Sequence, residues 1–553
     1  MRFARLALAS CFAVSQAQVL HQDAQQPLKL EESARRVAVI GAGAAGASAA
    51  YHLRKFADEA GVKANITIFE RNAYIGGRST TVQAFDDPSS DPIELGASIF
   101  VKVNYILSNA TEEFGLRTVE LGSAREYDGY NGTARLAAAP LLGVWDGEKF
   151  LITQSATNRW WDTAKLLWRY GLAPIRTNNL VKKTVNAFLS LYEEPMFPFA
   201  SLSDAAYELG LTAVTATTGW QYLEENKVGG LFAQEVVQAA TRVNYAQNLG
   251  LIHGLETMVC MATDGAVGVE GGNWKIFEKM VEGATKDVLL GTAVSAVRKV
   301  EGGGYILEWK EVEGGDGSAE SKMKSEHFDS VVLAAPHQFS DIEIAPESKR
   351  VPDKVPYVQL HVTLFTSPHL LSPQAFNLPP DELVPEIILT TLQPDEKPGS
   401  DPKGVGRAGF FSISLLQPIV NRKVNPPREE FTYKIFSPTE IDAKFLIKIL
   451  GLQDSPLGAE DDEGEEAQLD VSKEDVSWIY RKVWHSYPYH YPRVTFEEIS
   501  LDKDFWYTSG IEGFISTMET SALMGKNVAR LIVDDWMGRK KDTHVDDGGK
   551  REL

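Results

Sequence analysis

Apolar runs alternate with helix-forming runs near the start of the chain. Residues 36–40 (RVAVI) form a short β-branched run that leads straight into the glycine-rich stretch GAGAAG at 41–46. The run ASAAYHLRKF then has a helix-forming composition, and a second apolar run at 66–69 ends in Glu70. A strand, a helix and a second strand in this order predict a βαβ unit and therefore an α/β fold.

The three glycines of the first turn have the spacing GxGxxG. Gly41 allows the tight turn, Gly43 lets a pyrophosphate approach the backbone, and Gly46 lets the helix pack closely on the sheet. The start of the helix offers N–H groups to phosphate oxygens, and Glu70 is placed to accept hydrogen bonds from a ribose hydroxyl. The pattern predicts a dinucleotide site, and a purely structural glycine turn is the alternative.

The segment after Glu70 indicates which dinucleotide is bound. It reads RNAYIGGRSTT and contains Arg71, the pair Gly76 and Gly77, and Arg78. Paired glycines let the backbone pass near the same pyrophosphate, and an arginine can pair with its charge. NAD enzymes need no such segment. The segment after Glu70 resembles the FAD-binding half of the amine-oxidase-like flavoprotein superfamily. The resemblance implies FAD as the cofactor.

Features of a nucleotide domain return later in the chain. The segment 288–309 contains expected strands separated by glycine turns. It resembles the β-meander of FAD enzymes, which implies that the backbone near Val294 contacts the adenine end. The turn YTSGIEG at 507–513 precedes a helix expected from about residue 514, and it places Gly510 and Glu512 at the flavin end.

The intervening segments complete a two-domain arrangement. Residues 121–265 are expected to be helical, whereas strand-like runs occur at 357–365 and 407–416. The superfamily resemblance implies an α/β fold in which a Rossmann-like FAD-binding domain is interleaved with an α+β substrate domain. The expected FAD-binding parts are 36–120, 266–340 and 501–537, and the expected substrate parts are 121–265 and 341–500.

Charge and the chain ends bear on partners and compartment. The chain has 553 residues and a net charge of −20, which disfavours nucleic acid and anionic membranes as partners. Part of that charge lies in an expected solvated insertion at 458–475. Residues 1–17 have the basic start, apolar run and small residues of a signal peptide, and no later run is apolar enough for a transmembrane anchor. We therefore expect the lumen of the secretory pathway, with the lysosome or vacuole or secretion as destinations. The charged tail 538–553 ends in KREL, one residue away from an ER retrieval signal.

Three asparagines and one cysteine bear on the expected location in the secretory pathway. Asn65, Asn109 and Asn131 each begin a glycosylation sequon. Asn65, which precedes the second strand, is expected to be too buried for use, and Asn131 to be the most accessible. Cys260 alone remains after signal removal, so no internal disulfide can form, and it is expected to be a buried thiol rather than a covalent flavin attachment.

An aromatic, basic helix is expected at 158–172 (NRWWDTAKLLWRYGL). Apolar residues at helical spacing most often face a core, which is the favoured interpretation here. Contact with a membrane surface and the wall of an apolar substrate site are the alternatives.

Four sequence blocks go beyond the superfamily. They resemble the prenylcysteine oxidase (farnesylcysteine lyase) family and read TRVNYAQNL (241–249), VGVEGGNWKIFEKMV (267–281), WHSYPYHYPR (484–493) and GIEGFISTMETSALMGKNVA (510–529). The resemblance implies an FAD-dependent thioether oxidase that uses O₂ and water to convert prenylcysteine, a small amphiphile, to cysteine, a prenyl aldehyde and hydrogen peroxide. A lumenal amine or polyamine oxidase, and a prenyl- or lipid-binding flavoprotein without turnover, stay open because a fold does not fix a substrate.

The sequence identifies neither a catalytic base nor a metal site. Histidines are candidates because imidazole titrates in the right range, although a single histidine is more often structural. Arg242 and Asn244 belong to a family-like block, and Glu512 and Glu519 lie near the expected flavin-end turn, where helix capping is the simpler explanation. The candidate histidines are His253, His361, His485 and His490.

Overall fold

The structure is a computed structural model that describes residues 34–120, 139–155, 159–312, 322–348, 350–396, 404–452 and 471–539. The expected signal peptide, the Asn131 sequon, most of the acidic insertion and the charged tail from residue 540 lie outside the described residues.

A mostly parallel, six-stranded sheet forms the first part of the molecule, in the order β20-β21-β13-β1-β2-β9. Its central strand contains Val37, Ala38 and Val39, which are fully buried, as expected for a strand covered on both faces. All neighbours pair in parallel except β20 and β21. The strands are β1 (Arg35–Ile40), β2 (Ala64–Phe69), β9 (Val288–Leu289), β13 (Ser330–Leu333), β20 (Ser500–Asp502) and β21 (Phe505–Tyr507).

Helices from both ends of the chain lie against this sheet. The glycine-rich turn leads into α1 (Ala44–Ala60), which packs against α13 (Met518–Trp536) and α11 (Trp274–Ala284). A Cβ atom on Gly525 would lie 2.2 Å from the carbonyl oxygen of Ala45, so this glycine allows α13 to approach α1 closely. The last helix of the chain thereby packs on the first.

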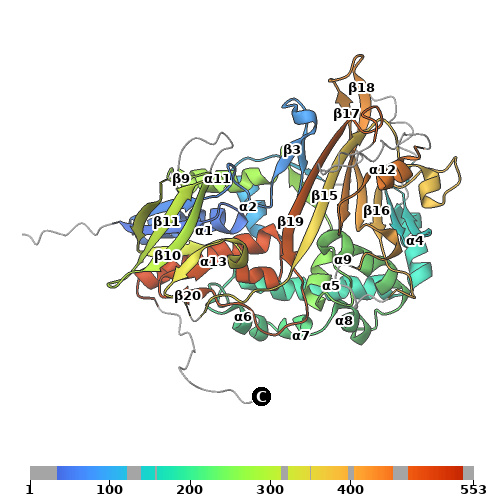
Figure 1. Ribbon diagram of the computed structural model, residues 1–553. Coiled ribbons are helices and arrows are strands. Elements are labelled where there is room, and N and C mark those ends of the chain that lie inside the picture. Colours follow the sequence, from blue (N-terminus) through green and yellow to red (C-terminus); the bar gives the residue numbers. More distant parts are fainter. Residues whose placement is uncertain are drawn as a thin grey trace, which may run out of the picture.

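A seven-stranded sheet forms the second part, in the order β19-β15-β18-β17-β16-β6-β7. Figure 1 shows β15 and β19 rising beside the first part, with α5, α8 and α9 below this sheet. Its pairs are antiparallel except β6 with β16. The strands are β6 (Leu142–Trp145), β7 (Phe150–Gln154), β15 (Tyr357–Ser367), β16 (Ile387–Thr390), β17 (Ser412–Asn421), β18 (Arg428–Ser437) and β19 (Trp478–Pro488).

The hairpin β6–β7 departs from the helical expectation for 121–265. Its turn contains Gly147 at φ +95°, and the Asp146 carboxylate accepts hydrogen bonds from the backbone of Glu148 and Lys149, both at 2.8 Å. An Asp–Gly turn of this kind favours a hairpin over a helix. Among the described residues from 139 to 265, helix begins at Arg159.

Three smaller sheets complete the strand inventory. The expected strand at 288–294 is divided at Gly291, whose φ of +62° ends β9 before β10 begins. The smaller sheets are β12-β11-β10-β14, β3-β4 and β5-β8. Their strands are β3 (Thr81–Gln83), β4 (Pro92–Glu94), β5 (Thr118–Glu120), β8 (Val267–Val269), β10 (Thr292–Lys299), β11 (Tyr305–Glu311), β12 (Lys324–Phe328) and β14 (Glu343–Ala345).

The other helices lie mainly between residues 159 and 260. They are α2 (Tyr105–Glu113), α4 (Arg159–Tyr170), α5 (Ala173–Leu189), α6 (Leu202–Glu208), α7 (Thr212–Thr215), α8 (Gly219–Glu225), α9 (Gln238–Tyr245), α10 (Gly254–Cys260) and α12 (Ala443–Leu450). Among the helices of the described ranges, none has the length and hydropathy to cross a membrane.

The interpretation of the apolar residues of α4 as core residues is wrong for Leu167 and Trp168, and the side chains of Trp160 and Trp161 lie outside the described ones. Trp168 is 90% exposed, and Leu167 and Leu172 also face outward. The helix is held instead by its last turn, where Arg169 and the Tyr170 hydroxyl both donate to the Glu235 carboxylate. One side of α4 is therefore anchored, and its aromatic residue at 168 is left on the surface.

Candidate active site

A single large cavity of about 1390 Å³ joins the glycine-rich turn to the second sheet. Pockets for one small molecule usually measure about 300–1,000 Å³, so this cavity has room for more than one ligand. Its lining comes from α1, the 70–107 segment, α5, the sheet strands β15 to β19 and the start of α13.

Two glycine segments form one end of the cavity. Gly41, Gly43, Gly76 and Gly77 all line it, and the Gly76 N–H donates to the Ala42 carbonyl at 3.0 Å. A Cβ on Gly77 would lie 3.3 Å from the Gly43 Cα, whereas a Cβ on Gly43 would meet no protein atom closer than 3.9 Å. Side chains at this pair would occupy the space that a pyrophosphate needs. The segment therefore fits a dinucleotide.

Gly46 serves the fold and does not line the cavity. An added Cβ would lie only 1.9 Å from the Gly41 carbonyl oxygen, so the first helical turn can pack on the loop only if this residue is glycine. This contact holds the N-terminus of α1 at the cavity, where its N–H groups face an incoming phosphate.

Glu70 lies at the end of β2, beside the same loop. One carboxylate oxygen accepts a hydrogen bond from the Ala42 N–H at 2.8 Å, and the other accepts from the Asn72 N–H at 2.8 Å. A carboxylate oxygen can accept more than one hydrogen bond, so Glu70 keeps capacity for a ribose hydroxyl. Arg71 also lines the cavity, and its guanidinium donates to the Phe339 carbonyl at 2.8 Å.

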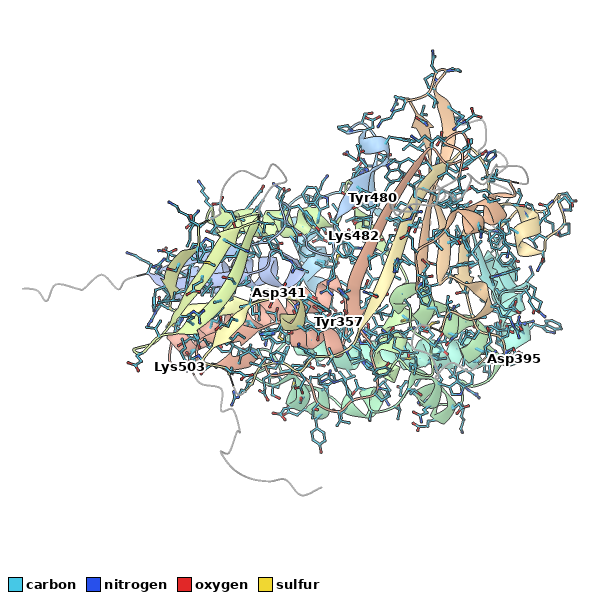
Figure 2. All side chains as sticks on the ribbon, viewed as in Figure 1. Asp341, Tyr357, Asp395, Tyr480, Lys482 and Lys503 are labelled. Atoms are coloured by element: carbon cyan, nitrogen blue, oxygen red, sulfur yellow. The ribbon has the colours of Figure 1, made fainter. Side chains whose placement is uncertain are left out.

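Arg78 and Glu512 form a two-pronged ion pair inside the cavity. The two guanidinium nitrogens lie 2.9 and 2.6 Å from the two carboxylate oxygens, and Glu512 is 3% exposed. The Tyr357 hydroxyl donates to the same carboxylate at 3.2 Å. Figure 2 shows Tyr357 at the end of β15 nearest the first sheet. The structure places Arg78 on Glu512, so the expected pairing of Arg78 with pyrophosphate stays a prediction.

Besides Gly46, two of the expected cofactor residues lie outside the cavity lining. Val294 is buried in β10, where it packs with Phe69 and Trp309. Gly510 lies in the turn before α13 and packs against Glu497, while the neighbouring Ser509 and Glu512 line the cavity. Their expected backbone contacts to the cofactor stay predictions.

Much of the remaining cavity lining is apolar. Side chains from α2, α5, α10 and the second sheet contribute to it, and several are buried. They include Leu107, Val185, Phe188, Val259 and Leu360. Cys260 also lines the cavity, as a buried thiol whose pKa is raised by burial. A long hydrocarbon chain suits these walls.

One of the four candidate histidines lines the cavity. His485 on β19 stacks on the Phe339 ring at 4.3 Å between centroids, whereas His361, on β15, does not line it. His253 caps α10 because its Nδ1 accepts from the Glu256 N–H at 3.1 Å. His490 is buried beside it, and neither of its ring nitrogens has a hydrogen-bond partner in the described structure.

His253, Glu256 and His490 bring possible ligand atoms within 4.8 Å of one another. A metal-binding imidazole offers one nitrogen lone pair and normally carries a proton on the other nitrogen. In His253 the Nδ1 lone pair is already committed to the helix cap, so this ring would have to lose both protons to bind a metal. The cluster therefore suits neutral buried groups better than a metal.

The family-like block at 241–249 supplies both a structural and a cavity residue. Arg242 is fully buried and donates to Asn248 at 2.8 Å and to the Val405 carbonyl at 2.7 Å, so it ties α9 to the loop beside β17. Asn244 lines the cavity, and its amide donates to the Ala240 carbonyl at 2.9 Å. The Asn244 side chain is thus oriented at the cavity wall.

Glu519 caps a helix, as the sequence suggested, but the helix is α2 and not α13, in which Glu519 itself lies. Its carboxylate accepts from the N–H groups of Ile106 and Leu107, at 2.9 and 3.0 Å, in the first turn of α2. The Tyr192 hydroxyl donates to it at 2.8 Å, and burial raises the pKa of Glu519 to about 7.

The sequence reasoning missed Lys434. This residue lies in β18, is 7% exposed and lines the cavity. A lysine inside the short aromatic and aliphatic run Tyr433–Phe436 is the signal that could have revealed it.

Comparisons with known proteins agree with this geometry. A family model described as prenylcysteine lyase matches residues 153–547, and one for an NAD(P)-binding Rossmann-like domain matches 39–112. Farnesylcysteine lyase of Arabidopsis thaliana is 28% identical over 92% of this chain and 90% of its own length. Prenylcysteine oxidase 1 of Mus musculus is 25% identical over 93% of this chain and 91% of its own length.

Solved structures of amine oxidases share the fold. A redesigned putrescine oxidase has a TM-score of 0.52 at 14% identity, covering 91% of this chain and 99% of that one. Cyclohexylamine oxidase from Brevibacterium oxydans has a TM-score of 0.51 at 15% identity, covering 91% of this chain and 100% of that one. These likenesses confirm the interleaved, amine-oxidase-like fold. Since the first family model spans most of the sequence, the chain belongs to the prenylcysteine lyase family.

Proposed function

We propose that this protein is an FAD-dependent oxidase that cleaves the thioether of prenylcysteines. The observation that carries the proposal is the single cavity, which joins a dinucleotide cradle to an apolar compartment of a size that suits a prenyl chain. The products are cysteine, a prenyl aldehyde and hydrogen peroxide, formed with one O₂ and one water. Membership of the prenylcysteine lyase family supports the same substrate class.

Different residues of the chain bind different parts of FAD. The glycine pairs and the N-terminus of α1 receive the pyrophosphate of FAD, and Glu70 receives a ribose hydroxyl. When bound, FAD accepts a hydride from the allylic carbon next to sulfur and passes the electrons to O₂. The Arg78–Glu512 pair fixes the turn before α13 to the segment after the second glycine pair.

The apolar walls orient the substrate and control access of water. Phe188 and Leu107 from two helices enclose the compartment that suits the prenyl chain, which removes its apolar surface from water. After the hydride leaves, water adds to the same carbon, the carbon–sulfur bond breaks, and the thiol of cysteine departs with a proton. Sulfur and the double bond both stabilise the positive charge at that carbon, so positioning matters more than a strong base.

The visible spectrum of the purified protein tests this function. We expect a flavin band that bleaches when S-farnesylcysteine is added without oxygen, and that returns with peroxide when air is admitted. S-Dodecylcysteine is the control because it lacks the allylic double bond and should leave the band unchanged. Bleaching by putrescine but not by S-farnesylcysteine would assign the protein to amine oxidation instead. Binding of S-farnesylcysteine and S-dodecylcysteine without any bleaching would indicate a lipid-binding flavoprotein without turnover.

We also propose that the protein works in the lumen of the secretory pathway. The sequence of residues 1–17 supports this, and so do two accessible sequons. Asn65 lies exposed in β2 and Asn109 exposed in α2, so the expectation that Asn65 is too buried was wrong: its side chain points out at the start of the strand. Digestion with an N-glycosidase should increase the electrophoretic mobility of the protein from its native host. An unchanged mobility, together with an intact N-terminus, would contradict the proposal.

Exposed apolar residues at the end of α4 and the start of α5 support contact with a neutral lipid surface. Trp168, Leu172 and Ile175 are 90%, 59% and 48% exposed, and α5 continues from Ile175 to cavity residues such as Phe188. An apolar patch with an indole ring suits the interface of a membrane, from which a prenylated amphiphile could reach the cavity. Flotation with phosphatidylcholine vesicles tests this, because Trp168→Ser should then reduce the floated fraction several-fold.

A further inference from the structure

Lys434 presents a buried ammonium group to the cavity. Its strand, β18, lies between β15 and β17, and the side chain is 7% exposed. Nζ donates to the Glu94 carbonyl oxygen at 2.8 Å and to the Ser98 hydroxyl at 3.3 Å. It also lies 4.9 Å from the centre of the Phe436 ring. An ammonium has three N–H groups, so these two acceptors leave one for a ligand.

This cation has no carboxylate partner in the described structure. The Glu94 side chain belongs to the neighbouring segment, but its charge does not form an ion pair with Nζ within 4 Å, and one of its oxygens has no hydrogen-bond partner. Burial lowers the pKa of Lys434 to about 8, which the Glu94 charge partly offsets. Buried charges are normally paired, because removing a charge from water without a partner of opposite charge is costly.

The other cations of the cavity are either paired with a carboxylate or less buried than Lys434. Arg78 is paired with Glu512, and Arg71 donates to the Phe339 carbonyl. Lys482 on β19 is partly exposed, and its Nζ lies 4.8 Å from the centre of the Trp484 ring. Figure 2 shows Lys482 on β19 close to Tyr480. Lys434 is thus a buried cation of the cavity lining whose ammonium forms no ion pair with a carboxylate within 4 Å in the described structure.

We propose that Lys434 binds the α-carboxylate of the cysteine moiety of the substrate, and so selects free prenylated cysteines over their carboxyl esters and amides. The proposal rests on the proposed thioether oxidase function. A charge-assisted hydrogen bond between an ammonium and a carboxylate is short and strong in a site that excludes water.

The position of Lys434 suits this role. Of its two acceptors, Glu94 directly precedes the segment 95–98, which lines the cavity, and Ser98 is the last residue of that segment. Apolar side chains of α5 and α10 line the same cavity. A prenylcysteine with its carboxylate on Lys434 therefore has an apolar compartment available for its tail.

Binding of a non-reactive thioether to the holoenzyme tests the proposal. The ligands are S-dodecylcysteine and its methyl ester, and the measurement is the dissociation constant from isothermal titration. We expect the native protein to bind the acid about 10- to 100-fold more tightly than the ester, as a hydrogen bond to a charged group implies. Lys434→Met should remove this preference, mainly by weakening the acid. Lys444→Met, which changes an exposed lysine of α12, is the matched control and should keep it.

Each other outcome counts against the proposal. If the native protein binds acid and ester equally, Lys434 does not read the carboxylate, whatever happens in the variants. If Lys434→Met weakens both ligands equally, the lysine supports the cavity wall instead. If Lys434→Met does not fold, the proposal is tested by Lys434→Gln and by the affinities of the native protein for the acid and the ester. Failure of S-farnesylcysteine to bleach the flavin would overturn the function, and it is read independently of these constants.

Discussion

Glu256 makes the stability of this protein depend on pH. Its side chain is fully buried at the start of α10, where one carboxylate oxygen accepts from the Ser516 N–H at 3.4 Å and the other has no partner in the described structure. Its neighbours His253 and His490 bring no positive charge, because burial lowers the pKa of both imidazoles. Burial raises the pKa of Glu256 from 4.5 to about 8.

The direction of the effect follows from proton linkage. Between pH 4.5 and 8 the folded protein keeps a proton on Glu256 that the unfolded chain loses, so stability falls as pH rises through this window. The full shift corresponds to about 5 kcal/mol, at about 1.4 kcal/mol per pKa unit, and this is an upper value. Glu256→Gln resembles the protonated acid in shape and cannot ionise. The variant should therefore gain stability relative to the native protein as pH rises.

Urea unfolding at pH 5 and pH 8 measures this gain. The difference in unfolding free energy between Glu256→Gln and the native protein should increase by several kcal/mol from the lower to the higher pH. Glu225→Gln, at an exposed position in α8, is the control and should show the same difference at both values. An equal difference at both pH values for Glu256→Gln would refute the reasoning, because it would show that the carboxyl group is ionised in the folded protein or is not buried.

Four further substitutions separate the roles of the cradle, the ion pair and the surface. The Cβ of Gly43→Ala would lie no closer than 3.9 Å to any protein atom, so this variant should fold but lose flavin absorbance. Gly46→Ala places a Cβ 1.9 Å from a carbonyl oxygen, so this variant should give less folded protein. Equal yields and equal flavin contents of the two variants would contradict this contrast. Arg78→Met leaves Glu512 buried without its ion-pair partner. The free energy of unfolding in urea should fall by about 3 kcal/mol, which is the low end for buried ion pairs because the Arg78 side chain is 35% exposed. An unchanged urea midpoint would show that the ion pair contributes nothing to stability. Trp168→Ser should lower vesicle flotation while leaving the oxidation of detergent-free S-farnesylcysteine unchanged, and a loss of both would indicate a structural role.

The cofactor end could be predicted because its chemistry is local in sequence. The turn, the first helix and the acidic residue after β2 lie within 36–70, so their geometry follows from a single βαβ unit. Gly76 and Gly77 come only a few residues later, and the structure places them against Gly43. Local spacing was enough to place these residues together.

The substrate end could not be predicted because its contacts are distant in sequence. Arg78 pairs with Glu512, 434 positions away, and Lys434 reaches the Glu94 carbonyl from 340 positions away. Nothing in the local sequence around Arg78 distinguishes a phosphate ligand from a distant carboxylate, since a guanidinium binds both in the same way. Such pairs appear only when the strand order of two sheets is known.

The misreading of α4 has the same origin, and it bears on how substrate reaches the cavity. Hydrophobic periodicity shows that a helix has an apolar side, but it does not say what covers that side. In the structure Glu235 holds the last turn of α4, so the packing that the core interpretation assigned to Trp168 is not needed to hold the helix in place. The exposed residues then continue into α5, whose far end lines the apolar compartment. An enzyme whose substrate has a lipid tail gains from such a surface, because the tail can leave a lipid phase and enter the protein with little exposure to water.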